Sequence, residues 1–137
     1  MKSFTEDWNT HRVAVDKLAE ELGGVAFTKA PFDIVDKEKR FYEVKTVRPR
    51  TGRHSSECSV HISENEIKFG EIFEEGLTYI ILFKGNKYTI PFKDLKRKIE
   101  KAKPYKSNLF GTWRTYVLLC LSKKFLNEYN LLRREGC

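Results

Sequence analysis

The residues best suited to chemistry lie in the segment PFDIVDKEKRFYEVK, which spans positions 31–45. Within it, residues 36–39 carry no apolar side chain and separate two apolar runs, which predicts a hairpin turn between two strands. If these strands pair antiparallel, Asp33 falls opposite Glu43 or one residue away, and Cβ atoms at that separation lie about 5 to 8 Å apart. Alternate residues of a strand share a face, so Lys45 lies on the same side as Glu43. We therefore expect two carboxylates and one ammonium group to converge.

Two carboxylates beside a lysine suit the hydrolysis of a phosphodiester bond. Carboxylate oxygens are ligands that Mg²⁺ or Mn²⁺ prefers, and such a cation orients the phosphate and lowers the pKa of a bound water. We predict Asp33, Glu43 and the carbonyl of Val44 as metal ligands. The predicted catalytic set is Asp33, Glu43 and Lys45, with the lysine stabilising the attacking hydroxide or the charge that develops on the phosphate. The alternative is an exposed hairpin with an ordinary surface salt bridge.

The acid-x-Lys spacing occurs three times, at 43–45, 66–68 and 94–96, so the spacing alone is weak evidence. The second and third matches fall in predicted helices, where residues two apart point in different directions. Only the first match has a strand context and a second acid across a hairpin. The chemistry is therefore assigned to the first match.

The elements that position these residues follow from apolar spacing and turn residues. Helices are predicted at 4–22, from a capping box at Ser63 and Glu66 to near Gly76, at 92–103, and after Ser122. Strands are predicted at 25–28, 32–35, 40–47, 59–62, 78–83 and 87–90, with a tight turn at Gly85-Asn86. Residues 48–57 and 105–113 are predicted as loops, and residues 115–121 as either strand or helix. This order predicts an α/β fold with a mixed central β-sheet flanked by helices.

At these positions the sequence resembles the PD-(D/E)xK nuclease superfamily, which has the restriction-endonuclease-like fold and includes archaeal Holliday junction resolvases and Mrr-like nucleases. The matching residues are Pro31, Asp33, Glu43 and Lys45, with Pro31 one position farther from the acid than the motif's name implies. The order of elements over about residues 4–90 also resembles that family's αβββαβ core. The resemblance implies a Mg²⁺-dependent DNA endonuclease, often a homodimer, in which the two acids hold the metal.

The chain departs from this family in its first helix. Many relatives carry a metal-associated glutamate there, whereas residues 9–13 read Asn-Thr-His-Arg-Val. Asp16 and Glu20, on the polar flank of the same helix, are the candidates for that acid. His11 is a further candidate for contact with DNA or with the site, its alternative being an ordinary surface histidine.

The chain has 137 residues and a net charge of +7, and its basicity is segmental. Its length fits a single domain over 1–137, with the nuclease-like core at about 4–90 and a basic helix and C-terminal helical extension at about 91–137. Residues 84–124 hold twelve Lys or Arg against two acids, which suits a polyanion such as DNA. The predicted phosphate contacts are Arg48, Arg50 and Arg53 in the loop, and Lys93, Lys96 and Arg97 in the basic helix. A solvated lysine-rich surface and an acidic protein partner are the alternatives.

The remaining sequence features concern location and metals. The three cysteines form no CxxC pair, which favours a reducing compartment. The N-terminus carries acids where a signal peptide needs an apolar stretch, and the apolar runs are too short to cross a bilayer, so we expect a soluble, cytoplasmic protein with no membrane contact. His54, Cys58 and His61 have spacing that suits zinc, but no fourth ligand is apparent nearby.

Taken together, these features predict a metal-dependent DNA endonuclease that uses a metal-activated water and works as a homodimer. The alternative is a catalytically inactive nucleic-acid-binding module of the same fold, which the missing helix glutamate would favour. The intact trio of Asp33, Glu43 and Lys45 distinguishes the two, since binding alone does not require it.

Overall fold

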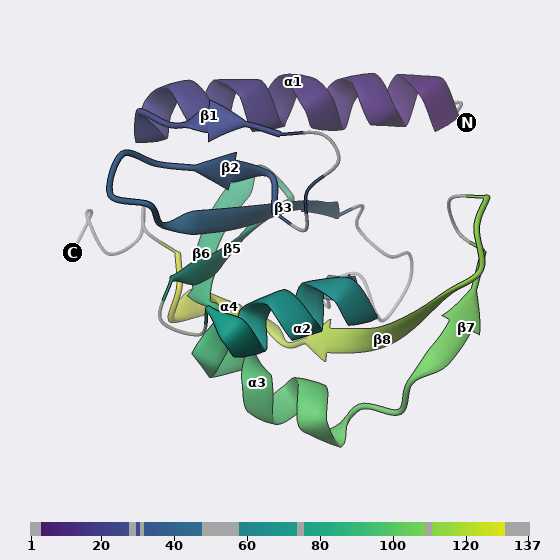
Figure 1. Ribbon diagram of the computed structural model, residues 1–137. Coiled ribbons are helices and arrows are strands. Elements are labelled where there is room, and N and C mark those ends of the chain that lie inside the picture. Colours follow the sequence, from purple (N-terminus) through teal and green to yellow (C-terminus); the bar gives the residue numbers. More distant parts are fainter. Residues whose placement is uncertain are drawn as a thin grey trace.

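The computed structural model describes residues 4–27, 30, 32–47, 58–73, 76–108 and 111–130, and for residues 4–9 it describes the backbone alone (Figure 1). The helices are α1 (Phe4–Leu22), α2 (Glu64–Ile72), α3 (Phe92–Lys101) and α4 (Lys123–Asn127). The strands are β1 (Val25–Ala26), β2 (Ile34–Val35), β3 (Phe41–Val47), β4 (Cys58–Ser63), β5 (Leu77–Phe83), β6 (Asn86–Pro91), β7 (Tyr105–Ser107) and β8 (Arg114–Leu121). Within these ranges, no helix combines the length and the apolar character needed to cross a membrane.

The described strands form two sheets, a five-stranded sheet of order β1-β2-β3-β5-β6 and a three-stranded sheet of order β4-β8-β7. Strands β3 and β5 run parallel, and the other neighbours are antiparallel. The parallel pair needs a long crossover, which the stretch containing β4 and α2 supplies. The predicted mixed α/β class is confirmed. The expectation of one central sheet is wrong, because β4 pairs with β8 instead of joining the larger sheet.

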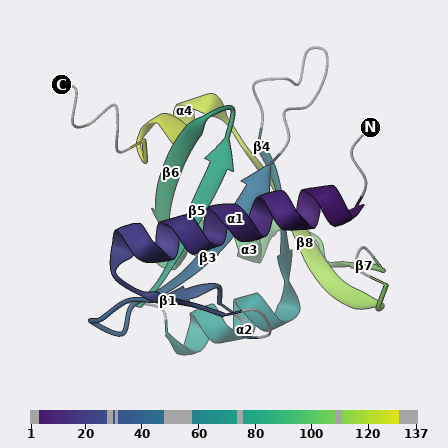
Figure 2. The same ribbon diagram turned by 90° about the horizontal axis from the view of Figure 1, so that it is seen from above.

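The five-stranded sheet has an apolar layer on each face. Helix α1 lies across one face and packs Val15 and Leu18 against Val44 and Ile80 (Figure 2). The other face, which includes Tyr79, packs against β4, β8 and α3 in the larger core. Because side chains alternate along a strand, the burial of Val44 under α1 sends its neighbours Glu43 and Lys45 to the opposite face.

The C-terminal third differs most from the prediction. Residues 105–107, predicted as loop, form β7, because Tyr105 pairs with Tyr116 of β8. Residues 115–121, predicted as either strand or helix, lie in strand β8, which pairs with β4. The predicted helical extension is reduced to α4 in the described part of the chain. Its predicted cap is confirmed, since the hydroxyl of Ser122 accepts a hydrogen bond of 3.1 Å from the amide of Phe125.

Several predicted boundaries shift by a few residues. Helix α2 ends at Ile72, not near Gly76, and α3 ends at Lys101 instead of residue 103. The turn between β5 and β6 lies at Lys84 and Gly85, one residue earlier than predicted. Both have positive φ, 51° and 76°, the geometry of a turn that matches the twist of a hairpin.

The predicted hairpin turn at 36–39 is confirmed, and Asp36 organises it. Its carboxylate accepts hydrogen bonds from the amides of Glu38 and Arg40, at 3.0 and 2.9 Å. It also accepts bonds from the guanidinium of Arg40, at 2.7 Å, and from the hydroxyl of Tyr42, at 3.0 Å. Burial alone would raise the pKa of Asp36, but these hydrogen bonds outweigh it and hold the pKa below its usual value. The turn therefore depends on an ionised carboxylate.

Replacing this carboxylate tests the role of the turn. In Asp36→Asn the amide nitrogen faces the donors of Arg40 and Tyr42, so we expect the free energy of unfolding at neutral pH to fall by about 2 kcal/mol. The pKa of Asp36 is lower in the folded protein than in the unfolded chain, where it is about 3.9. The extra stability of wild type over the variant is therefore present above about pH 3.9 and is lost as the pH falls through the pKa of the folded protein. Urea unfolding of both proteins across pH checks this. A difference that stays constant into acid would contradict the role assigned to the ionised form.

Candidate active site

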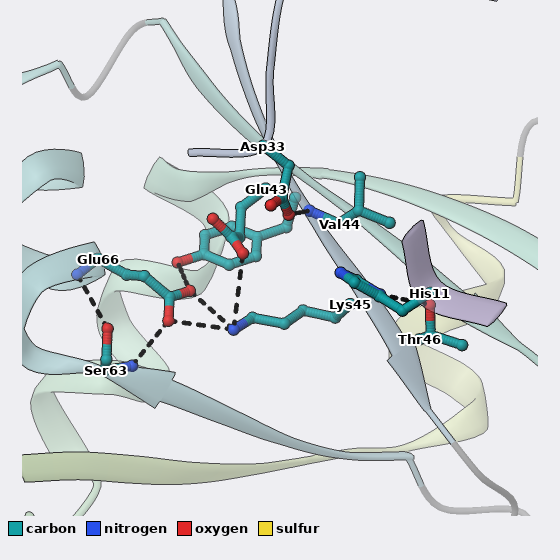
Figure 3. A network of polar contacts seen from close by, with 9 residues as sticks. His11, Asp33, Glu43, Val44, Lys45, Thr46, Ser63 and Glu66 are labelled. Atoms are coloured by element: carbon teal, nitrogen blue, oxygen red, sulfur yellow. Dashed lines mark hydrogen bonds and ion pairs between the residues drawn. The ribbon is translucent and has the colours of Figure 1, made fainter. Parts of the chain in front are cut away.

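The hairpin brings Asp33 beside Glu43, as predicted. The register pairs Ile34 with Tyr42, and the amide of Asp33 donates a hydrogen bond of 2.8 Å to the carbonyl of Tyr42. Beyond the pair, the carboxylate of Asp33 accepts a 2.8 Å hydrogen bond from the amide of Val44 (Figure 3). This bond fixes one oxygen of Asp33 over the strand that carries Glu43.

Lys45 lies in the same cluster, but its closest partner is a residue that the motif does not include. Its Nζ lies 2.8 Å from Oε1 of Glu66 on α2 and 3.9 Å from Oε1 of Glu43 (Figure 3). The side chains of Lys45, Glu43 and Glu66 are only 19%, 13% and 12% exposed. The alternative of an exposed hairpin with a surface salt bridge is therefore wrong, because these charges are largely removed from water.

Glu66 is fixed from three sides. It is the third residue of α2, where its carboxylate accepts a 3.0 Å hydrogen bond from the amide of Ser63, while its own amide donates to the hydroxyl of Ser63 at 3.2 Å. This is the predicted capping box. The hydroxyl of Tyr79 donates a third bond, at 3.2 Å. The network thus joins the hairpin, β5 and the start of α2 around the ammonium of Lys45.

Helix α2 holds its place because it packs closely on the core. A Cβ atom at Gly70 would lie 2.4 Å from the ring of Phe92, so only glycine permits this approach. Gly70 lies one turn after Glu66 on the same helix. The position of the Glu66 carboxylate therefore depends on a tertiary contact as well as on its cap.

The electrostatics of the cluster follow from burial. Burial raises the pKa of Glu43 well above its usual value, and Glu66 and Asp33 add to the effect while Lys45 opposes it. Burial would lower the pKa of Lys45, but Glu66 and Glu43 more than compensate, so the pKa is raised. The two glutamates therefore favour the protonated form of Lys45.

Helix α1 contributes His11, which lies near the cluster. Its Nδ1 is 3.0 Å from Oγ1 of Thr46, the residue after Lys45 (Figure 3). Burial lowers the pKa of His11, with Asp33 acting against this and Lys45 acting with it. His11 is therefore neutral at pH 7. It occupies the part of α1 where the resemblance leads one to expect an acid.

The two helix acids named from the sequence lie elsewhere. Asp16 is 56% exposed and forms a salt bridge of 3.2 Å with Arg12. Glu20 is exposed too. Among the contacts of the described residues, neither carboxylate touches Asp33, Glu43 or Lys45. Among its described side chains, which begin at Thr10, helix α1 thus offers no acid in contact with the cluster.

The side chains of the cluster include oxygen donors that could hold a metal ion. In the described ranges, no three His, Cys, Asp or Glu side chains are placed as a ready cluster for a metal. The available donors are the carboxylates of Asp33 and Glu43 and nearby backbone carbonyls. Mg²⁺ is commonly bound by one or two carboxylates, with waters and substrate phosphate as the other ligands. The residues present therefore fit a cation of this class, held in part by its substrate.

The other sequence candidates have mixed outcomes. Pro31, His54 and the loop arginines Arg48, Arg50 and Arg53 lie outside the described residues. On α3, Lys93 and Arg97 are exposed and Lys96 is half-buried, and α3 lies on the opposite side of the molecule from α1 (Figure 1). The zinc alternative has no support, because Cys58 is fully buried in the core and Nδ1 of His61 is hydrogen-bonded to the hydroxyl of Tyr105.

Two features of the cluster were missed from sequence alone. The sequence predicts Glu66 as a capping residue and as the acid of a helical acid-x-Lys match, but not as a partner of Lys45. Nothing in the local sequence pointed to Tyr79 or to the contact between Lys45 and α2. Comparison with known proteins does not supply these roles either, since no family model and no curated protein matches the chain.

Proposed function

We propose that this protein is a metal-dependent DNA endonuclease of the PD-(D/E)xK type, built on a restriction-endonuclease-like core. The observation that carries the proposal is the meeting of Asp33, Glu43 and Lys45 in a largely buried cluster at a hairpin. Helix α1, the three strands β1 to β3, helix α2 and strand β5 follow one another in the αβββαβ order, with β4 inserted before α2. Burying three charged groups together costs stability, so a catalytic role explains them better than a structural one.

In this proposal Asp33, Glu43 and the carbonyl of Val44 hold Mg²⁺ or Mn²⁺. The bound cation would supply the charge that lowers the pKa of a water molecule and neutralises the phosphate. The amide of Val44 orients Asp33 through its 2.8 Å hydrogen bond. Lys45, kept protonated by Glu66 and Glu43, stabilises negative charge that develops on the phosphate in the transition state. The attacking group is a water molecule, and the products are two DNA ends.

The proposal extends to partners and location. The excess of Lys and Arg over residues 84–124 supports DNA as the substrate. A homodimer provides two active sites, which can cut the two strands of a duplex together. Cys58 and Cys120 are free thiols in the structure, in keeping with action in the reducing cytoplasm.

One observation favours a second candidate, a nucleic-acid-binding module without catalytic activity. The described side chains contain no ready metal cluster, and the closest partner of Lys45 is Glu66. A protein of this kind would use the basic surface and leave the carboxylates as a structural network. The two candidates differ in one measurable property, cleavage that requires a divalent metal.

A cleavage assay separates them. Purified protein is incubated with supercoiled plasmid, linear duplex and a four-way junction, in Mg²⁺, Mn²⁺ or EDTA. The proposal expects nicking or cutting in the metals and none in EDTA, because the metal must activate the water. Binding that falls steeply with salt while all three substrates stay intact would instead identify the binding module.

A further inference from the structure

Strands β7 and β8 form an arm that contacts strand β4 and the start of helix α2. We define the β7–β8 arm as residues 105–108 and 111–116. Its strands pair Tyr105 with Tyr116 and Ser107 with Arg114. Figures 1 and 2 both show β7 and the adjoining end of β8 at the edge of the molecule, away from the five-stranded sheet. The arm therefore adds little to the core at its outer end.

The base of this arm is joined to the active-site cluster. The hydroxyl of Tyr105 is hydrogen-bonded to His61 of β4. His61 lies two residues before Ser63, whose amide donates a hydrogen bond to the carboxylate of Glu66. Besides burial, the charge of Lys45 lowers the pKa of His61. At the start of α2, Glu64 is hydrogen-bonded to Thr115 of the arm. Two connections thus relate the arm to the helix and lysine of the site.

One face of the arm leads from its tip toward the site. Alternate residues share a face, so Arg114 and Tyr116 of β8 lie on one side, with Tyr105 and Ser107 opposite them across the strands. Because His61 pairs with Leu118 farther along β8, it lies on that same face. A cation, two tyrosines and a histidine therefore follow one another along this face.

The tip of the arm exposes an aromatic side chain in a basic setting. Trp113 is 70% exposed, although a tryptophan gains most from being buried. Arg114 and Lys106 beside it are exposed as well. From residue 101 to residue 127 the sequence contains six Lys or Arg and no Asp or Glu. The tip thus combines an exposed aromatic side chain with a local excess of basic residues.

We propose that the β7–β8 arm binds an unpaired segment of DNA, with Trp113 stacked on a base and with Arg114 and Lys106, which lie on opposite faces of the two-stranded ribbon, contacting the phosphates on either side of that base. Aromatic stacking combined with basic side chains is how proteins bind single-stranded nucleic acids. Bases inside an intact duplex are stacked on each other and offer no free face. The inference rests on the proposed function and deepens it, because it assigns the enzyme to DNA that has a single-stranded segment beside the cut.

Fluorescence measures this binding directly. The chain contains two tryptophans, so Trp8→Phe leaves Trp113 as the single reporter. This protein is titrated in EDTA with a short oligo-dT strand, with a blunt duplex, and with that duplex carrying a 3′ single-stranded extension. We expect strong quenching by the single strand and by the extended duplex, because both can place a base on the indole. The blunt duplex is expected to cause little quenching.

Affinity measured with labelled DNA supplies the second readout. Trp113→Ala is expected to weaken binding of the single strand about tenfold and binding of the blunt duplex less than about twofold. Ile72→Ala is the matched control, because Ile72 is 74% exposed on α2, away from the arm, and should leave both affinities unchanged.

Three results would overturn the inference. They are equal quenching by blunt duplex and single strand, unchanged affinity in Trp113→Ala, and a blue shift of Trp113 emission that grows with protein concentration alone. The last would identify a second copy of the chain as the occupant. Because these titrations contain no divalent metal, they are independent of cleavage. If single-stranded DNA quenches Trp113 but the protein never cuts DNA, the binding role of the arm stands and the proposed catalysis is wrong. If the protein cuts DNA but Trp113 is not quenched, the proposed catalysis stands and the binding role of the arm is wrong.

Discussion

Asp33→Asn is expected to reduce Mg²⁺-dependent DNA cleavage by at least about a thousandfold. The asparagine oxygen can still accept the hydrogen bond from the amide of Val44, so the hairpin remains intact. What is lost is one negative charge from a donor set that has only two carboxylates. Glu43→Gln should have a comparable effect for the same reason. Single-turnover cleavage of a labelled duplex, with saturating enzyme, measures the rate of the chemical step.

The controls separate chemistry from binding and from folding. Both variants should bind DNA in EDTA as tightly as wild type, because neither residue is assigned to a phosphate contact. Asp94→Asn is the matched control, since Asp94 belongs to another acid-x-Lys match and its carboxylate accepts a bond from Tyr129 on the surface, at 2.9 Å. It should retain full activity. Cleavage by Asp33→Asn at the wild-type rate would show that this carboxylate does not hold the metal.

The parts of the site that lie within one hairpin could be predicted from sequence. The turn at 36–39 is specified by local residues, and its length sets the register. Once the turn is known, Asp33 must lie beside Glu43, and alternation then places Lys45 on the same face as Glu43. The capping box at the start of α2 can also be predicted from sequence, because Ser63 and Glu66 are three residues apart.

The rest of the site depends on contacts between segments far apart in sequence. Lys45 and Glu66 are separated by 21 positions, and the orientation of α2 relative to β3 follows from packing such as that of Gly70 on Phe92. No periodicity encodes that orientation. The second sheet is not predictable for the same reason, since the paired residues of β4 and β8 lie 53 to 63 positions apart in the sequence.

The contact between Lys45 and Glu66 changes how the lysine is expected to work. A lysine on a flexible stem loses conformational freedom when it is held, so a fixed partner prepares it for the transition state. Glu66 is itself held by the amide of Ser63 and the hydroxyl of Tyr79. We therefore assign Glu66 as a positioning residue, which acts through Lys45 and does not itself touch the substrate.

Glu66→Gln tests this assignment. The glutamine oxygen, in the place of Oε2, can keep the capping bond to the amide of Ser63 and still accept from Lys45 at 3.1 Å. Its NH₂ group replaces Oε1, which lies 2.8 Å from the ammonium of Lys45, so that contact and the negative charge are lost. Lys45 is then left with Glu43 as its charged partner, at 3.9 Å in the wild-type structure. We expect kcat to fall about ten- to a hundredfold with little change in KM. Steady-state kinetics on the substrate preferred by wild type measures both constants.

The matched control for this variant is Glu64→Gln on the same helix turn. Glu64 pairs with Lys68 at 3.0 Å, and its side chain is 51% exposed. Glutamine keeps an oxygen that can bond with Thr115 of the arm, so the same loss of charge should leave kcat unchanged. Glu66→Asp keeps the charge on a shorter stem and should recover part of the lost rate. If Glu66 served only to cap α2, glutamine would preserve activity because it preserves the cap. Wild-type kcat in a folded Glu66→Gln protein would therefore assign the contact with Lys45 to stability and not to catalysis.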